Sequence, residues 1–128
     1  MGNELGILAL YGLVVIVTIL LQVLAAAGQV GLVPLAGNRE GMEPLTGAAF
    51  RLDKAQHNAV IAMALFAPAI LLLSAKGGFT ASTLLAAQVF LIARIAYVAV
   101  YALGIAWVRT LVWVVAFLAT LFLYAAAL

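Results

Sequence analysis

The sequence contains no cysteine, only one histidine and few charged residues. The lack of cysteine excludes disulfide bonds, thiolate metal sites and a protein thiol nucleophile. His57, the only histidine, has no paired carboxylates near it in the sequence, so we expect no metal site. The net charge of +2 comes from thinly spread residues, which do not form the basic patch that nucleic-acid binding requires. We therefore expect no nucleic-acid partner.

Charged residues make up only 8% of the 128 residues and apolar residues 69%, whereas soluble domains have about 25% and roughly 45–50%. A soluble fold of this length could not bury so much apolar surface. A membrane-spanning helix needs about 20 mostly apolar residues. Four segments meet that requirement: 5–30, 46–75, 79–104 and 107–127. The sequence therefore predicts an all-α membrane protein, a single four-helix up-down bundle over residues 1–128.

The basic residues are unevenly distributed along these segments. Five of the six flank the first and third connections: Arg39, Arg51, Lys54, Arg94 and Arg109. Only Lys76 lies at the opposite end, and basic residues favour the cytoplasmic side. The distribution predicts that loops 34–46 and 104–107 are cytoplasmic and that both termini lie outside. The short, Ala-, Leu- and Val-rich chain favours a bacterial inner membrane.

Three of the predicted helices carry a stripe of polar or aromatic residues that starts at this basic end. At about 100° per residue, the members of each stripe share one face. They are Arg51, Lys54 and Asn58 on the second helix, Arg94, Tyr97 and Tyr101 on the third, and Arg109, Trp113, Ala116 and Thr120 on the fourth. Two interpretations stay open. The stripes are either a border that snorkels to lipid headgroups or a pocket for an anion.

The segments FRLDKAQHN, ALFAP, ARIAYVAVYALG and RTLVW, in this order and spacing, resemble the MAPEG family, the membrane-associated proteins in eicosanoid and glutathione metabolism. The resemblance covers about half of the chain, from the second helix to the start of the fourth. It implies a homotrimer of four-helix bundles. In the family's enzymes glutathione binds between neighbouring subunits near the cytoplasmic face.

The same resemblance implies roles for seven residues. Those implied to bind glutathione or another anion are Arg51, Lys54, Asn58, Arg94 and Tyr97, and those implied to be catalytic are Arg109 and Tyr101, which would stabilise the thiolate. Two positions depart from the family pattern. Lys54 stands where an arginine is usual, and Ile61 stands where a glutamate is usual. That glutamate would pair with the ammonium group of glutathione, which Ile61 cannot do.

Two functions follow as hypotheses. The first is a glutathione-dependent transferase or peroxidase that acts on lipophilic electrophiles and uses glutathione as co-substrate. The alternative is a non-catalytic family member that binds an anionic lipid or serves as an accessory subunit of a membrane complex. The expected partners are further copies of this chain, lipids or lipophilic small molecules, and other membrane proteins.

Overall fold

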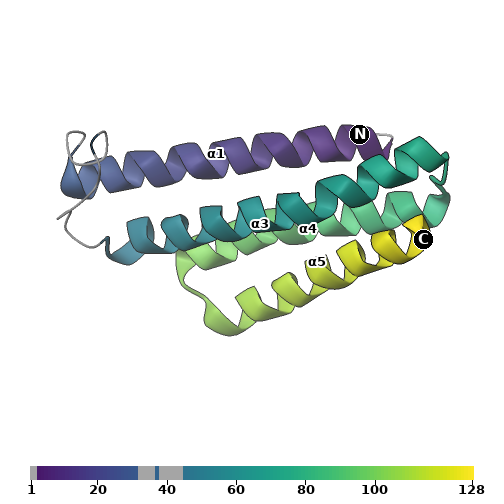
Figure 1. Ribbon diagram of the computed structural model, residues 1–128. Helices are drawn as coiled ribbons and strands as arrows, with labels where there is room; N and C mark the ends of the chain where they lie inside the picture. The colour runs from purple at the N-terminus through teal and green to yellow at the C-terminus, as the bar shows by residue number, and fades with distance from the viewer. Residues whose placement is uncertain (1–2, 32–36, 38–44) are drawn as a thin grey trace.

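The computed structural model describes residues 3–31, 37 and 45–128. Over these residues the chain forms four helices (Figure 1), namely α1 (Glu4–Val30), α3 (Gly47–Lys76), α4 (Ala81–Leu103) and α5 (Ala106–Ala127). Each helix lies where a span is predicted, with ends within two residues of the prediction. All four are long and apolar enough to cross a membrane. The chain is therefore an all-α integral membrane protein.

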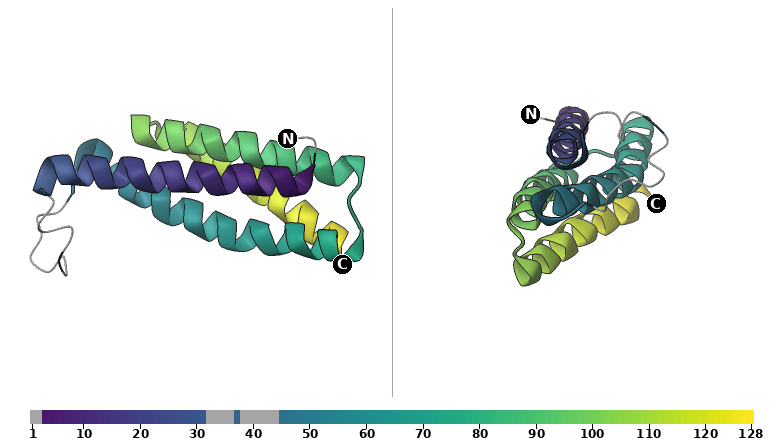
Figure 2. Two further views of the ribbon diagram at one scale, coloured as in Figure 1. Left: turned by 90° about the horizontal axis from the view of Figure 1, so that it is seen from above. Right: turned by 90° about the vertical axis from the view of Figure 1, so that its left-hand side faces the viewer.

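The helices run alternately up and down, so that both termini lie at one end of the bundle (Figure 1). The two views of Figure 2 place α1 and α5 on opposite sides of the α3–α4 pair, and each packs against both of these helices. Most of the predicted loop 34–46, including Arg39, lies outside the described residues. At the end with the termini, the Lys76 Nζ donates a hydrogen bond of 2.6 Å to the Ala127 carbonyl oxygen.

Polar side chains cap the starts of two helices, and glycines follow the ends of three. The Asn3 side chain accepts a hydrogen bond from the Gly6 N–H at the start of α1. The two tight turns follow Gly77 and Gly104, whose φ angles of 63° and 80° lie in the left-handed region that favours glycine. A reciprocal capping pair, Thr80 and Thr83, opens α4. These turns hold neighbouring helices antiparallel.

Aromatic rings fill the centre of the bundle. The Phe66 and Phe90 rings stack with centroids 3.9 Å apart, and the Tyr11 ring meets Phe90 edge-on at 4.9 Å. The Tyr11 hydroxyl donates a hydrogen bond of 2.9 Å to the Ala59 carbonyl oxygen. Ala59 is fully buried, as are several other alanines, which let the helices approach closely. The core thus joins α1, α3 and α4 near the middle of the bundle.

A buried polar pair joins α1 to α4 near the termini. Glu4 is 4% exposed, and the Thr83 hydroxyl donates a hydrogen bond of 2.6 Å to its carboxylate. Thr83 also belongs to the cap of α4, so one side chain both starts a helix and fixes its neighbour. We expect this pair to set the alignment of α1 against α4.

Candidate functional site

A polar cavity of about 320 Å³ lies between α3, α4 and α5, toward the end opposite the termini. Five of its six lining residues belong to the predicted stripes, and the sixth is Thr110. The lining comprises Asn58 from α3, Tyr97 and Tyr101 from α4, and Arg109, Thr110 and Trp113 from α5. The helical periodicity of each segment turns these side chains toward one space. The volume is at the lower end of the range for small-molecule sites, about 300–1,000 Å³.

Arg109 is the basic residue of this cavity, and it lies beside the two tyrosines. The Arg109 guanidinium carbon lies 4.6 Å from the centre of the Tyr101 ring, and the Tyr97 and Tyr101 rings meet edge-on at 5.5 Å. A guanidinium at this distance is attracted by the negative face of the ring, which fixes its position. The half-buried Arg109 keeps its donors available to an anion, because no hydrogen bond from its guanidinium is formed within the described residues.

Arg94 lies deeper, at the junction of the helices. It is 1% exposed and its guanidinium carbon lies 4.4 Å from the centre of the Tyr97 ring. The Tyr11 hydroxyl of α1 is close to it. Within the part of the chain that the structure describes, the Arg94 Nε and Nη2 atoms and the Asn58 Oδ1 atom are buried without hydrogen-bond partners. Buried donors and acceptors without partners cost free energy, and a ligand could satisfy them.

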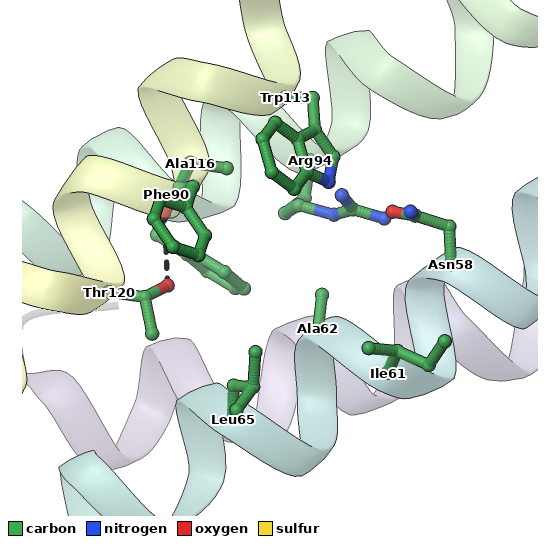
Figure 3. Close-up of a pocket in the computed structure, with 10 residues that line it drawn as sticks. Asn58, Ile61, Ala62, Leu65, Phe90, Arg94, Trp113, Ala116 and Thr120 are labelled. Atoms are coloured by element: carbon green, nitrogen blue, oxygen red, sulfur yellow. Dashed lines mark hydrogen bonds between the residues drawn. The ribbon is translucent and has the colours of Figure 1, made fainter.

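A second cavity, of about 130 Å³, adjoins the first (Figure 3). The two share Asn58 and Trp113. Its lining is mostly apolar and comprises Asn58, Ile61, Ala62, Leu65, Phe90, Arg94, Trp113, Ala116, Phe117 and Thr120. In Figure 3 the Arg94 and Asn58 side chains point toward one another at one side of this cavity. The site therefore has a polar compartment and an apolar one.

Two of the residues predicted to bind a ligand lie away from both compartments. The Arg51 Nε donates a hydrogen bond of 3.0 Å to the Ala102 carbonyl oxygen, close to the carboxyl end of α4. With Arg109 it lines a separate cavity of about 150 Å³ beside the α4–α5 turn. Lys54 is exposed, and its ammonium group lies 5.5 Å from the centre of the Phe50 ring. Around the two compartments the structure thus joins Asn58, Arg94, Tyr97, Tyr101 and Arg109, but neither Arg51 nor Lys54.

A comparison with known protein families gives one match. A model of the MAPEG family matches residues 7–128, which is nearly the whole chain. The chain belongs to the MAPEG family. No curated protein and no solved structure gives a match. Membership extends the resemblance beyond the quoted segments, to α1 and to all of α5.

The charged residues that line the site of this MAPEG protein, Arg94 and Arg109, are both positive. No carboxylate from the described residues lines either compartment. Ile61, at the position where the sequence resemblance implies a glutamate, is 61% exposed and lines the apolar compartment. The described groups suit an anionic ligand, but they offer no anionic partner for a cationic group.

Sequence reasoning did not single out Tyr11 and Phe90 as neighbours of this site. Phe90 lines the apolar compartment. The Tyr11 ring packs edge-on against the Phe90 ring, and its hydroxyl lies close to Arg94. A signal exists for Tyr11, since it shares the three- and four-residue spacing of Ile7, Val15 and Thr18 on the buried face of α1. That spacing identifies a buried face without identifying which polar group it meets.

Proposed function

We propose that this MAPEG protein is a glutathione-dependent transferase or peroxidase that acts on lipophilic electrophiles. The observation that carries the proposal is the Arg109 guanidinium stacked on Tyr101 in a polar cavity, with an apolar cavity directly beside it. A polar thiol and a lipophilic acceptor need two adjoining environments of this kind. Glutathione is the substrate that supplies the thiol.

Arg109 would hold the glutathione sulfur as a thiolate, because a nearby positive charge stabilises the deprotonated form, which is the nucleophile. Tyr101 would fix the Arg109 guanidinium through its ring and offer its hydroxyl to the bound tripeptide. Asn58 and Tyr97 would donate hydrogen bonds to glutathione, and Arg94 beneath them would add positive potential. Arg51 and Lys54 would contribute at longer range, at the outer edge of the site.

With a carbon electrophile, the thiolate sulfur would form a bond to carbon, and the leaving group would depart with its electron pair. With a hydroperoxide, two glutathione molecules would be oxidised to the disulfide while the hydroperoxide is reduced to an alcohol and water. In both reactions the membrane would deliver the acceptor, because lipophilic molecules partition into it.

Purified protein tests this proposal through calorimetric titration with glutathione and through turnover of lipophilic electrophiles. We expect saturable heat from the wild-type protein and a much weaker signal from Arg109→Met. A wild-type titration without heat of binding, together with no turnover, would refute the proposal. Thermal unfolding in the same detergent checks that the variant is folded.

A second function is favoured because the described residues that line the site carry positive charge and no carboxylate. A non-catalytic protein could place the headgroup of an anionic lipid against Arg94 and Arg109, or act as an accessory subunit of a membrane complex. Lipid extraction from the purified protein tests this alternative. It requires an anionic lipid that co-purifies with the wild type and is lost from Arg94→Ala and Arg109→Ala, whereas absence of bound lipid from all three proteins excludes it.

We further propose that the protein is a homotrimer, which would supply additional groups to a site open at its rim. Native mass spectrometry from a mild detergent should show three copies, and monomers alone would contradict this.

The proposed orientation, with the α4–α5 turn cytoplasmic, can be tested with single cysteines because the chain has none of its own. An impermeant maleimide should reach Ser82→Cys in intact cells, but Ala106→Cys only after lysis.

A further inference from the structure

A groove of about 480 Å³ runs between α1 and α4, on the α1 side of the bundle (Figure 2). Five residues of α1 between Leu13 and Leu21 line it, together with Leu52 of α3 and four residues of α4 between Ile95 and Ala102. We call it the α1–α4 groove. It shares no lining residue with the polar and apolar compartments described above. It is therefore a separate cavity, and it is larger than either of them.

The shape of the groove follows from the side chains on its two walls. Ala99 and Ala102 on α4 are too small to fill the space opposite α1. Leu13 and Val17 on α1 are 58% and 53% exposed, and Ile95 on α4 is 46% exposed. These exposed apolar side chains belong to helices that span the membrane, so the groove opens onto lipid.

The groove offers an occupant almost no polar contact. Thr18 is its only polar lining residue. The Thr18 hydroxyl donates a hydrogen bond of 2.8 Å to the Val14 carbonyl oxygen of its own helix, so its donor is already used. Burial of apolar surface is the interaction that such a lining favours. The chemistry suits a hydrocarbon chain along the whole length of the groove.

The groove also has the length of one leaflet. The eight residue steps from Leu13 to Leu21 rise about 12 Å along α1. Half of the hydrocarbon core of a bilayer is about 15 Å thick. On α4 the groove occupies the part that ends at the α4–α5 turn, because Ile95 and Ala102 both lie in the second half of Ala81–Leu103. The groove thus lies in the leaflet on the side of that turn.

A fixed arginine lies at the end of the groove that is nearest this turn. The Arg51 Nε donates a hydrogen bond of 3.0 Å to the carbonyl oxygen of Ala102, which lines the groove. The Arg51 guanidinium carbon would lie 3.5 Å from a Cβ at position 104, and glycine there leaves room for it. The Arg51 Nη atoms form no hydrogen bond within the described residues, and guanidinium groups bind phosphate well.

From these observations we infer that the α1–α4 groove is a binding site for one anionic phospholipid. One acyl chain lies in the groove between α1 and α4, and the phosphate accepts hydrogen bonds from Arg51. This site differs from the lipid site considered above at Arg94 and Arg109. It does not depend on the proposed function, because a lipid can bind here whether or not the protein is an enzyme.

Lipid titration followed by native mass spectrometry tests this site in the detergent-purified protein. The wild type should bind one phosphatidylglycerol per chain, about fivefold more tightly than phosphatidylcholine with the same acyl chains, which corresponds to about 1 kcal/mol for one basic residue. Arg51→Gln should abolish this preference and leave phosphatidylcholine binding unchanged, whereas Arg51→Lys should retain most of it. Glycerol phosphate, which has no acyl chain, should not bind.

A filled groove tests the position of the acyl chain. Ala99→Leu should weaken the binding of both lipids about tenfold, the loss expected when roughly two methylene groups are displaced. Val17→Phe fills the groove from α1 and repeats the test should Ala99→Leu fail to fold. Ala125→Leu is the matched control, because Ala125 is an exposed alanine near the other end of the bundle.

Several results would overturn the inference. They are equal binding of the two lipids by the wild type, uptake that does not saturate, binding of glycerol phosphate alone, and lipid binding that neither filled groove alters. A smaller oligomer in Ala99→Leu with unchanged lipid binding would also overturn it, since a second copy of the chain would then cover the groove. A phosphatidylglycerol with a photoreactive acyl chain should crosslink to residues 13–21 and 95–102, and crosslinks confined to α5 would contradict the site.

Discussion

The Arg109 guanidinium lies against the face of the Tyr101 ring, 4.6 Å from its centre, across the turn that joins α4 to α5. This contact fixes a cation at the edge of the polar cavity without using its hydrogen-bond donors. It also suggests that the ring of Tyr101, as well as its hydroxyl, contributes to the chemistry.

Substitutions at Tyr101 separate these two contributions. Tyr101→Phe keeps the ring under Arg109 and should retain most of kcat. Tyr101→Leu removes the ring and should lower kcat about tenfold, because a cation–π contact contributes about 0.5–2 kcal/mol. Steady-state kinetics with glutathione and an aryl chloride provide the measurement. Equal losses in both variants would assign the role to the hydroxyl instead.

Ile61→Glu restores a carboxylate at the position where the family usually has one. We expect the Kd for glutathione to fall about fivefold, since an ion pair at a partly exposed site contributes up to about 1 kcal/mol. Ile61→Gln is the matched control with similar size and no charge. Calorimetry with glutathione and with its deaminated analogue provides the readout. A similar gain for the analogue would show that the new carboxylate does not contact the ammonium group.

Arg94→Met should raise the apparent melting temperature by about 3 °C or more. The reason is that Arg94 is almost fully buried with unpartnered donors, and an apolar side chain of similar length avoids that desolvation cost. Arg109→Met, at a half-buried position, should change the melting temperature little. Thermal unfolding followed by circular dichroism compares them, and a clear decrease for Arg94→Met would show that this arginine stabilises the bundle.

Thr83→Val tests the link between α1 and α4. Removal of the hydroxyl leaves the Glu4 carboxylate buried without its donor and disrupts the cap of α4. We expect a loss of about 1–3 kcal/mol in the free energy of unfolding. Thr83→Ser retains the hydroxyl and should lose much less. Chemical unfolding measures the free energy of unfolding of both variants. Equal values for Thr83→Val and Thr83→Ser would mean that the hydrogen bond to Glu4 does not stabilise the fold.

The fold could be predicted from the sequence because lipid imposes simple requirements. Long apolar runs must be helices in a membrane, and glycines at positions 77 and 104 mark tight turns. Helical periodicity also places Arg94, Tyr97 and Tyr101 on one face, and the structure brings Tyr97 and Tyr101 to the same cavity as Arg109. These are consequences of local geometry, which the order of residues determines directly.

Contacts between distant segments could not be predicted in this way. Periodicity puts Arg51 and Lys54 on the same stripe as Asn58, yet the structure uses Arg51 to bond the Ala102 carbonyl oxygen and leaves Lys54 exposed. Which residues of a stripe face the cavity depends on where the neighbouring helix ends and how far it tilts. The contact of Tyr11 with Ala59 likewise depends on the alignment of α1 against α3.

The most direct test of the central claim is the ultraviolet difference spectrum of glutathione bound to the protein, compared between the wild type and Arg109→Met. A thiolate absorbs where a thiol does not, so the band reports the ionised sulfur itself. The account predicts a thiolate band with the wild type at neutral pH, and its loss in Arg109→Met under conditions where glutathione saturates both proteins. A band of equal height in the two proteins, or no band with saturated wild type, would contradict it.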